Sequence, residues 1–250
     1  MADQIDHEVF DPARLPDLPD AEIHHEHRDV SGGWLRPTVF GMMDGLVSNF
    51  ALIVGFAGGR ADPKTVSLAG LAGLVSGAFS MAAGEYISVQ SQNESMTAEL
   101  VVEERELRVN AEAELSELSA SYVARGVDQD VAEKFARQIT RDPRQALIVH
   151  AQEELGVDPT QLPSPRTAAI SSFLAFSVGA VIPVLPYLLG ATSVLISAIL
   201  AVITLVAAGA TASRFTDRGW AYSGARQLLF GVLAAAVTYG VGTLFHVSTG

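Results

Sequence analysis

Residues Ala168–Leu189 have the sequence AAISSFLAFSVGAVIPVLPYLL, and Ala191–Ser213 follow with ATSVLISAILAVITLVAAGATAS. Neither stretch contains a charged residue. A helix needs roughly 20 apolar residues to cross the hydrocarbon core of a bilayer, and both stretches reach that length. Buried helices of soluble proteins are rarely so long and so uninterrupted, so the pair predicts two membrane-spanning helices.

Three further apolar stretches reach the same length, namely Thr38–Ala57, Val66–Val89 and Gln227–Val247. The sequence therefore predicts an all-α integral membrane protein with five transmembrane helices. The polar segment between the second and third spans predicts a small helical insert. The expected parts are a flexible, acidic N-terminal segment (1–35), two spans (36–90), the insert as a cytoplasmic metal-binding domain (91–165) and three spans (166–250).

The basic residues predict how the spans are oriented. Of the 16 Lys and Arg, only Arg60 and Lys64 fall in segments that lie outside when the N-terminus is cytoplasmic. Lys and Arg accumulate in cytoplasmic segments, so we expect the N-terminus and the insert in the cytoplasm and the C-terminus outside. High Ala and Arg with little Lys favours a bacterial origin and hence the plasma membrane.

The overall charge restricts the partners. Asp and Glu outnumber Lys and Arg by 28 to 16, for a net charge of −12. This balance argues against nucleic acid, which requires basic surfaces, and is compatible with cations. There is no Cys, so a bound metal would have oxygen, nitrogen or thioether ligands.

Two acidic residues, Asp44 and Glu85, lie inside predicted spans. A charge near the centre of a span costs about 2.5–3.5 kcal/mol on insertion scales, which a partner, water or a bound cation normally offsets. Met81 precedes Glu85 by one helical turn, and a thioether beside a carboxylate suits borderline divalent metals. The alternative is that both carboxylates extend to the membrane interface, and most Met residues serve only in packing.

Cap residues predict the helices of the insert. The stretch Glu99–Arg125 lacks Gly and Pro and precedes Gly126, which predicts one helix that ends there. Asp128 begins a second predicted helix that runs to about Thr140. Asp142 and Pro143 begin a third, which we expect to end at Gly156.

The acids of the insert are paired along predicted helix faces. Glu103 and Glu106 are three residues apart, Glu114 and Glu117 likewise, and His150 and Glu154 are four apart. Like charges on one face repel, so such a cluster either is simply solvated beside nearby Arg residues or binds cations. The insert contains no Glu-x-x-His motif, which disfavours ferritin-like oxidation, and we expect no enzymatic activity.

Several motifs resemble the vacuolar iron transporter family. They are Asp44-Gly-Leu-Val-Ser-Asn-Phe, Ser80-Met-Ala-Ala-Gly-Glu-Tyr-Ile-Ser-Val, Glu103-Glu-Arg-Glu106, Glu153-Glu-Leu-Gly, the Pro-x-x-Pro-Tyr of the third span and Arg226-Gln-Leu. The resemblance extends over roughly residues 36–247. It implies a homodimer that exports cytosolic Fe²⁺, and often also Mn²⁺, in exchange for protons.

The resemblance also implies roles for residues. Asp44 and Met81 match the family's membrane pathway, with Glu85 one turn further along. The glutamates that collect metal match Glu103, Glu106, Glu114, Glu117 and Glu154. Plant members carry a Met pair where this sequence has His150 and Ala151. Imidazole can still bind Fe²⁺, but it is a harder ligand than the thioether of Met. Mn²⁺ and Zn²⁺ are therefore further candidate ions for this site. The expected partners are divalent ions, protons and lipid, with no prosthetic group.

Several interpretations stay open. The alternatives to a metal exporter are a membrane-anchored metal store or sensor without flux, and an unrelated solute transporter whose acidic insert is only regulatory. The tract of His24, His25 and His27 beside Glu26 binds metal or is simply a tail. Pro183 and Pro186 predict a break or kink near the outer end of the third span. Small residues in the second and last spans predict close helix packing or a dimer contact.

Overall fold

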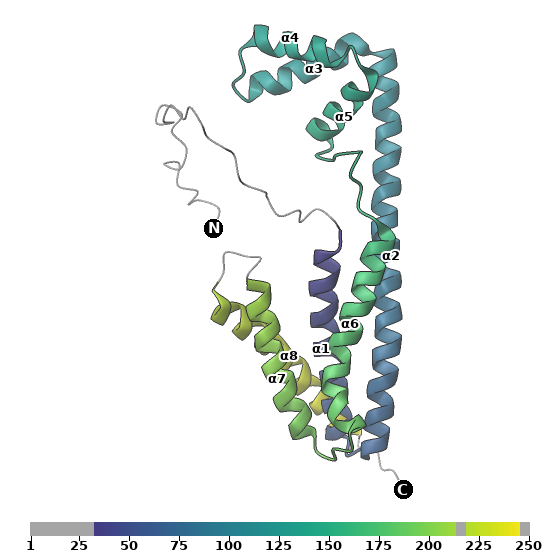
Figure 1. Ribbon diagram of the computed structural model, residues 1–250, viewed down its shortest axis with the longest axis vertical. Helices are drawn as coiled ribbons and strands as arrows, with labels where there is room; N and C mark the ends of the chain where they lie inside the picture. Colours follow the sequence, from purple (N-terminus) through teal and green to yellow (C-terminus); the bar gives the residue numbers. More distant parts are fainter. Residues whose placement is uncertain (1–32, 214–218, 246–250) are drawn as a thin grey trace. The chain divides into compact units, whose positions relative to one another are not determined.

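A computed structural model describes residues 33–213 and 219–245, and all its regular structure in these ranges is helical (Figure 1). The N-terminal segment, with the tract of His24, His25 and His27, lies outside the described residues. The helices are α1 (Leu35–Gly58), α2 (Pro63–Val109), α3 (Ala111–Ala124), α4 (Gln129–Ile139), α5 (Pro143–Glu154), α6 (Pro165–Leu188), α7 (Val194–Ala212) and α8 (Trp220–Phe245).

Five of these helices, α1, α2, α6, α7 and α8, are long and apolar enough to cross a membrane. The prediction of an all-α protein with five spans is therefore confirmed. The boundaries differ by a few residues where a local cap decides them. The fourth span begins at Val194 rather than Ala191, because the hydroxyl of Ser193 accepts a hydrogen bond from Leu195 N at 3.2 Å.

Side-chain caps also explain where α2 and α6 begin. Asp62 accepts hydrogen bonds from the backbone N–H groups of Lys64 (2.9 Å) and Thr65 (3.1 Å), and Pro63 occupies the first helical position. Ser164 accepts from Thr167 N at 3.3 Å, and Pro165 follows it. Each start thus combines an oxygen acceptor with a proline whose missing N–H leaves no unpaired donor.

α1 packs against α6, α8, α2 and α7. It approaches α6 so closely that a Cβ on Gly45 would lie 2.2 Å from Phe176 O, and one on Gly179 would lie 2.2 Å from Met42 O. A Cβ on Gly242 of α8 would lie 2.0 Å from Gly55 O of α1. These glycines permit backbone contact, as the abundance of small residues predicts.

Pro183 and Pro186 do not break the third span, since α6 continues through both and ends at Leu188. The kink that the sequence offered as the alternative stays a prediction. Each proline lacks the N–H that would donate to the carbonyl four residues earlier, so α6 loses two backbone hydrogen bonds in this region. Val184 between them is fully buried in a cluster with Ile53 of α1 and Val66 of α2. Tertiary packing therefore holds this turn in place.

α2 has 47 residues and continues past membrane length into the insert (Figure 1). At the helical rise of about 1.5 Å per residue it is about 70 Å long, against roughly 30 Å for a hydrocarbon core. The predicted uninterrupted helix Glu99–Arg125 is wrong, because the chain turns at Asn110 (φ −119°, ψ 33°) and α3 begins at Ala111. The side-chain amide of Asn110 donates to the carboxylate of Glu106.

The other predicted boundaries of the insert are confirmed. Gly126 follows α3 with φ +92°, and Gly156 follows α5 with φ +66°, both in the left-handed region that favours glycine. Asp142 accepts a hydrogen bond from Arg144 N at 2.9 Å where α5 begins. Asp128 precedes α4 as predicted, although its side chain makes no capping hydrogen bond.

Candidate metal centre

α5 contributes two adjacent groups to one face of the insert. His150 and Glu154 are four residues apart, and His150 Nδ1 lies 3.2 Å from Glu154 Oε1. His150 is only 1% exposed, with Ala146 and Ala151 buried on the same helix. The small alanines allow α5 to approach α2 closely, and this places the imidazole inside the insert rather than at its surface.

The turn at Asn110 brings a second helix to the same place. In an unbroken helix, Glu103 and Glu114 would lie roughly 16 Å apart along the axis. Because α3 leaves the line of α2 at Asn110, both carboxylates instead reach His150. The turn therefore converts two distant positions of the sequence into one site.

Three carboxylates converge on a single imidazole nitrogen. His150 Nδ1 lies 3.1 Å from Glu103 Oε1, 3.5 Å from Glu114 Oε2 and 3.2 Å from Glu154 Oε1. One ligand atom from each of the four residues can be chosen so that all lie within 4.8 Å of one another. Ligands of one metal ion with bonds of about 2.1 Å lie roughly 3–4 Å apart, so a small contraction would suffice.

The cluster is electrostatically unfavourable without a cation. Burial raises the pKa of Glu103 above its usual value, and the charges of Glu154 and Glu114 raise it further. Burial likewise raises the pKa of Glu114, against the opposing effect of His150. Both effects disfavour the charged carboxylates, and a divalent ion would reverse them.

Three carboxylate oxygens and one imidazole nitrogen form a ligand set suited to Fe²⁺, Mn²⁺ or Zn²⁺. The described residues offer no thiolate, and Ca²⁺ or Mg²⁺ would prefer oxygen alone. His150 Nε2 is buried and has no hydrogen-bond partner within residues 33–213 and 219–245. The ring is therefore held by packing and by the carboxylates at Nδ1, with no second polar contact to fix its tautomer.

Two predicted ligands lie outside this group of four. Glu117 is exposed on α3, and Glu106 is half-buried and accepts a hydrogen bond from Asn110. Both are nevertheless close enough for their charges to raise the pKa of Glu114, and Glu117 also raises that of Glu103. That Glu106 and Glu117 take part in metal binding stays a prediction, and both lie at the edge of the cluster.

A polar contact that sequence reasoning missed joins α3 to α5 beside the cluster. Tyr122 donates a hydrogen bond to Glu153 Oε1 at 2.9 Å, and Arg125 forms an ion pair with the same carboxylate. The guanidinium of Arg125 also lies 5.7 Å from the centre of the Tyr122 ring. The hydrogen bond from Arg125 lowers the pKa of Glu153, so this carboxylate stays charged and keeps α3 against α5.

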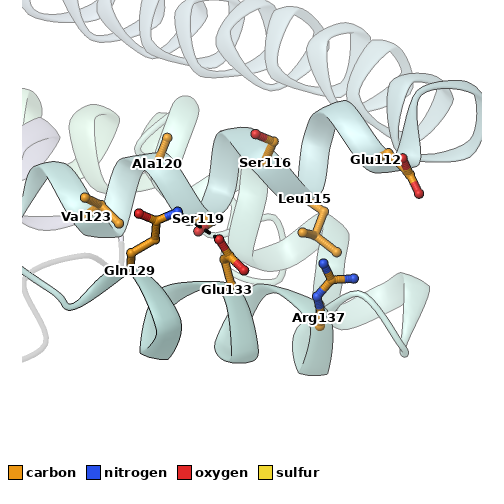
Figure 2. Close-up of a pocket in the computed structure, with 9 residues that line it drawn as sticks. All are labelled: Glu112, Leu115, Ser116, Ser119, Ala120, Val123, Gln129, Glu133 and Arg137. Carbon is orange, nitrogen blue, oxygen red and sulfur yellow. Dashed lines mark hydrogen bonds between the residues drawn. The ribbon is translucent and has the colours of Figure 1, made fainter.

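A hollow of the insert lies elsewhere, between α3 and α4 (Figure 2). It measures about 430 Å³ and is lined by Ser116, Ser119 and Glu133 among others. Gln129 donates to Glu133 Oε1 at 3.0 Å across its floor. Its α3 residues lie on the helix face opposite Glu114, and none of the predicted ligands lines it, so it is separate from the cluster.

A pocket of about 410 Å³ between α1, α2 and α6 contains both residues of the predicted membrane pathway. Asp44 of α1 and Met81 of α2 line it, together with Ser48, Ser80 and Phe176. Glu85 lies one turn beyond Met81, is 8% exposed, and does not line the pocket. The structure thus has Asp44 and Met81 in the lining of one pocket and leaves Glu85 at a separate position.

The fold and the two sites define a class of protein: a helical membrane protein with five candidate spans, an acidic intramembrane pocket and an insert rich in carboxylates. The sequence profile of the VIT family matches residues 35–243. The chain belongs to this family.

Characterised proteins are similar along nearly the whole chain. A vacuolar iron transporter of Acanthamoeba castellanii is 38% identical over 229 residues, which is 88% of this chain and 82% of that protein. Vacuolar iron transporter 1 of Oryza sativa subsp. japonica is 29% identical, over 91% of this chain and 92% of that protein. Vacuolar iron transporter homolog 2.1 of Arabidopsis thaliana is 32% identical, over 94% of this chain and 91% of that protein.

Proposed function

We propose that this protein transports divalent iron out of the cytosol in exchange for protons. The observation that carries the proposal is the presence, in one chain of the VIT family, of a four-ligand cluster and an intramembrane pocket with Asp44 and Met81. The names of similar proteins support iron as the cargo. Mn²⁺ is a second cargo compatible with the same ligands.

The insert captures the ion in this mechanism. Glu103, Glu114, His150 and Glu154 are the ligands, and Glu106 and Glu117 attract cations at the edge of the cluster. Because the pKa values of Glu103 and Glu114 are raised, these groups hold protons more readily than free glutamates do and release them when a metal binds. Metal capture is thereby linked to proton release on the cytosolic side.

The ion then moves to the pocket between α1 and α2. Asp44 provides charge and Met81 a polarisable sulfur, a combination that favours Fe²⁺ and Mn²⁺ over Ca²⁺ and Mg²⁺. Glu85, between this pocket and the cytoplasmic extension of α2, is the intermediate carboxylate. Protons that occupy these carboxylates after the metal leaves would return to the cytosol and complete the exchange.

The working assembly in this proposal is a homodimer. Asp44 is exposed on the surface of the single chain although it lies within a span. A carboxylate that faces lipid is costly, and a second copy against α1 and α2 would cover it. The distribution of Lys and Arg supports a cytoplasmic N-terminus and insert, with the C-terminus outside, and a bacterial plasma membrane is the proposed location.

Metal flux into proteoliposomes, with the internal pH recorded, tests this function. We expect Fe²⁺ to enter vesicles that are acidic inside and the internal pH to rise as it does. Metal binding that saturates without any flux would refute transport and favour the store or sensor. Fe²⁺ flux that leaves the internal pH unchanged would refute proton exchange, but the proposal that Fe²⁺ is transported would stand.

A further inference from the structure

Asn49 is a buried amide within the membrane that the proposed mechanism does not use. It follows Asp44 by five residues on α1, is 2% exposed and lines the same pocket as Asp44 and Met81. A polar side chain buried inside an apolar span normally has all its hydrogen-bonding groups paired. Asn49 does not.

Both hydrogens of the Asn49 amide are accounted for. Nδ2 donates to Gly70 O of α2 at 3.2 Å and to Ala180 O of α6 at 2.7 Å. Both acceptors are carbonyl oxygens, so the nitrogen rather than the oxygen must face them. The orientation of the amide is thereby fixed, and its oxygen must point elsewhere.

Among the described residues Asn49 Oδ1 has no hydrogen-bond partner, and it faces Gly73 of α2. A Cβ on Gly73 would lie 2.8 Å from Oδ1 and 2.7 Å from Cδ2 of Leu52. Gly73 and Leu52 both line the pocket. The missing side chain at residue 73 thus keeps space open in front of an unpaired oxygen, at the border of the pocket that holds Asp44 and Met81.

We propose that Asn49 Oδ1 is a further ligand on the ion's path, to which the cation passes from Asp44 and Met81. This inference rests on the proposed function. An amide oxygen is a good ligand for divalent cations and carries no charge, so it binds an ion without trapping it. The two hydrogen bonds at Nδ2 hold the orientation of the amide, so the oxygen keeps facing Gly73 and the lining of the pocket.

A purely structural role would make Asn49 a tie between α1, α2 and α6. That role needs only the nitrogen, which already makes both contacts. It gives no reason for an unpaired buried oxygen or for a glycine opposite it. A substitution that obstructs the oxygen and spares the nitrogen therefore separates the two roles.

Gly73→Ala is that substitution, because its methyl group would crowd Oδ1 and leave Gly70 and Ala180 untouched. The matched control is Gly240→Ala on α8, where an added Cβ meets nothing within 4 Å. In proteoliposomes we expect Gly73→Ala to lower kcat/KM for Fe²⁺ by about tenfold or more, as for the loss of one hydrogen-bond-like contact to a charge. The control should match the wild type.

Asn49→Asp is the second test and is used if Gly73→Ala does not fold. Asp has no N–H to donate to Gly70 O and Ala180 O, so this variant also loses the contacts between the three helices, and thermal melting first checks that it folds. A charged ligand on the path should lower KM for Fe²⁺ and also lower kcat, because the ion binds more tightly and leaves more slowly. A lower kcat with unchanged KM would indicate only a lost helix tie and overturn the inference.

Other outcomes are equally decisive. If Gly73→Ala transports like Gly240→Ala, the oxygen is not on the path, although the proposed function stands. If the wild-type protein moves no Fe²⁺, the proposed function fails and this inference fails with it.

Discussion

Replacing Glu103 by Gln should change the stability of the protein in opposite directions with and without metal. Glu103 is 9% exposed, and its carboxylate belongs to a group whose ligand atoms lie within 4.8 Å of one another. Two unit charges at that distance repel by about 3 kcal/mol at an effective dielectric of 20. Attraction to His150 offsets part of this, so we expect the metal-free variant to be more stable by about 1 kcal/mol.

The metal-free Glu103→Gln variant is expected to be the more stable protein because the pKa of Glu103 is raised in the folded state. The folded protein holds this proton at a pH where the unfolded chain has lost it, so stability decreases as the pH rises above the unfolded value. Gln carries no charge at any pH and removes this decrease. The stabilisation by the substitution should therefore be absent near pH 4 and grow toward neutral pH.

With bound metal, the wild type should be more stable than the Glu103→Gln variant. At a free Fe²⁺ or Mn²⁺ concentration a hundredfold above Kd, binding stabilises the wild type by about 2.7 kcal/mol. Loss of one charged ligand that weakens binding a hundredfold would leave only about 0.4 kcal/mol. Metal should thus raise the melting temperature of the wild type clearly and that of the variant only slightly.

Thermal melting of the full chain in detergent, with and without Mn²⁺, measures both effects. Glu104→Gln is the matched control: it removes the same charge one residue away, from an exposed ion pair with Arg108. Such pairs contribute little, about 0–1 kcal/mol. A Glu103→Gln variant that is less stable than the control without metal, and equally stabilised by metal, would refute the cluster as a cation site.

Three further substitutions test separate parts of the structure. Asp44→Asn should abolish Fe²⁺ flux while metal binding to the insert, measured by calorimetry, stays as in the wild type; undiminished flux would exclude Asp44 from the path. His150→Met should keep the fold and weaken Zn²⁺ binding relative to Fe²⁺, because imidazole is the better zinc ligand; an unchanged ratio of the two affinities would exclude His150 as a ligand. Glu153→Gln should lower the free energy of unfolding by about 1 kcal/mol through loss of the ion pair with Arg125, while the oxygen of Gln still accepts from Tyr122. Because the pKa of Glu153 is lowered, that difference should vanish as the pH falls through it, and a difference independent of pH would contradict the explanation.

The sequence predicted the spans well because their determinant is local. Uninterrupted apolar runs such as Ala168–Leu189 have few alternatives to a helix of membrane length. Caps such as Asp142 with Pro143 are equally local, and the structure has them where the pattern placed them. The break that Pro183 and Pro186 suggested does not occur in α6, because packing around Val184, which lies between them, outweighs their intrinsic preference.

The candidate site was predictable in its members and not in its geometry. Helical spacing paired His150 with Glu154, but no pattern within one helix shows that Glu103 meets Glu114. The sequence did contain a signal for the start of α3 at Asn110. Asn is a common residue directly before a helix, and acidic residues such as Glu112 and Glu114 are favoured in the first helical turn. The unpaired oxygen of Asn49 had no signal at all, since it depends on carbonyl groups of two other helices.

The length of α2 has a mechanical consequence. Met81 and Glu103 belong to the same unbroken helix and lie roughly 33 Å apart along its axis. A stiff rod of that length acts as a lever: a tilt of about 5° at Met81 displaces Glu103 by about 3 Å. Since Glu114, His150 and Glu154 belong to other helices, such a swing would open or tighten the carboxylate cluster. Under the proposed function, rearrangement around the intramembrane pocket would therefore change the affinity of the insert for the ion.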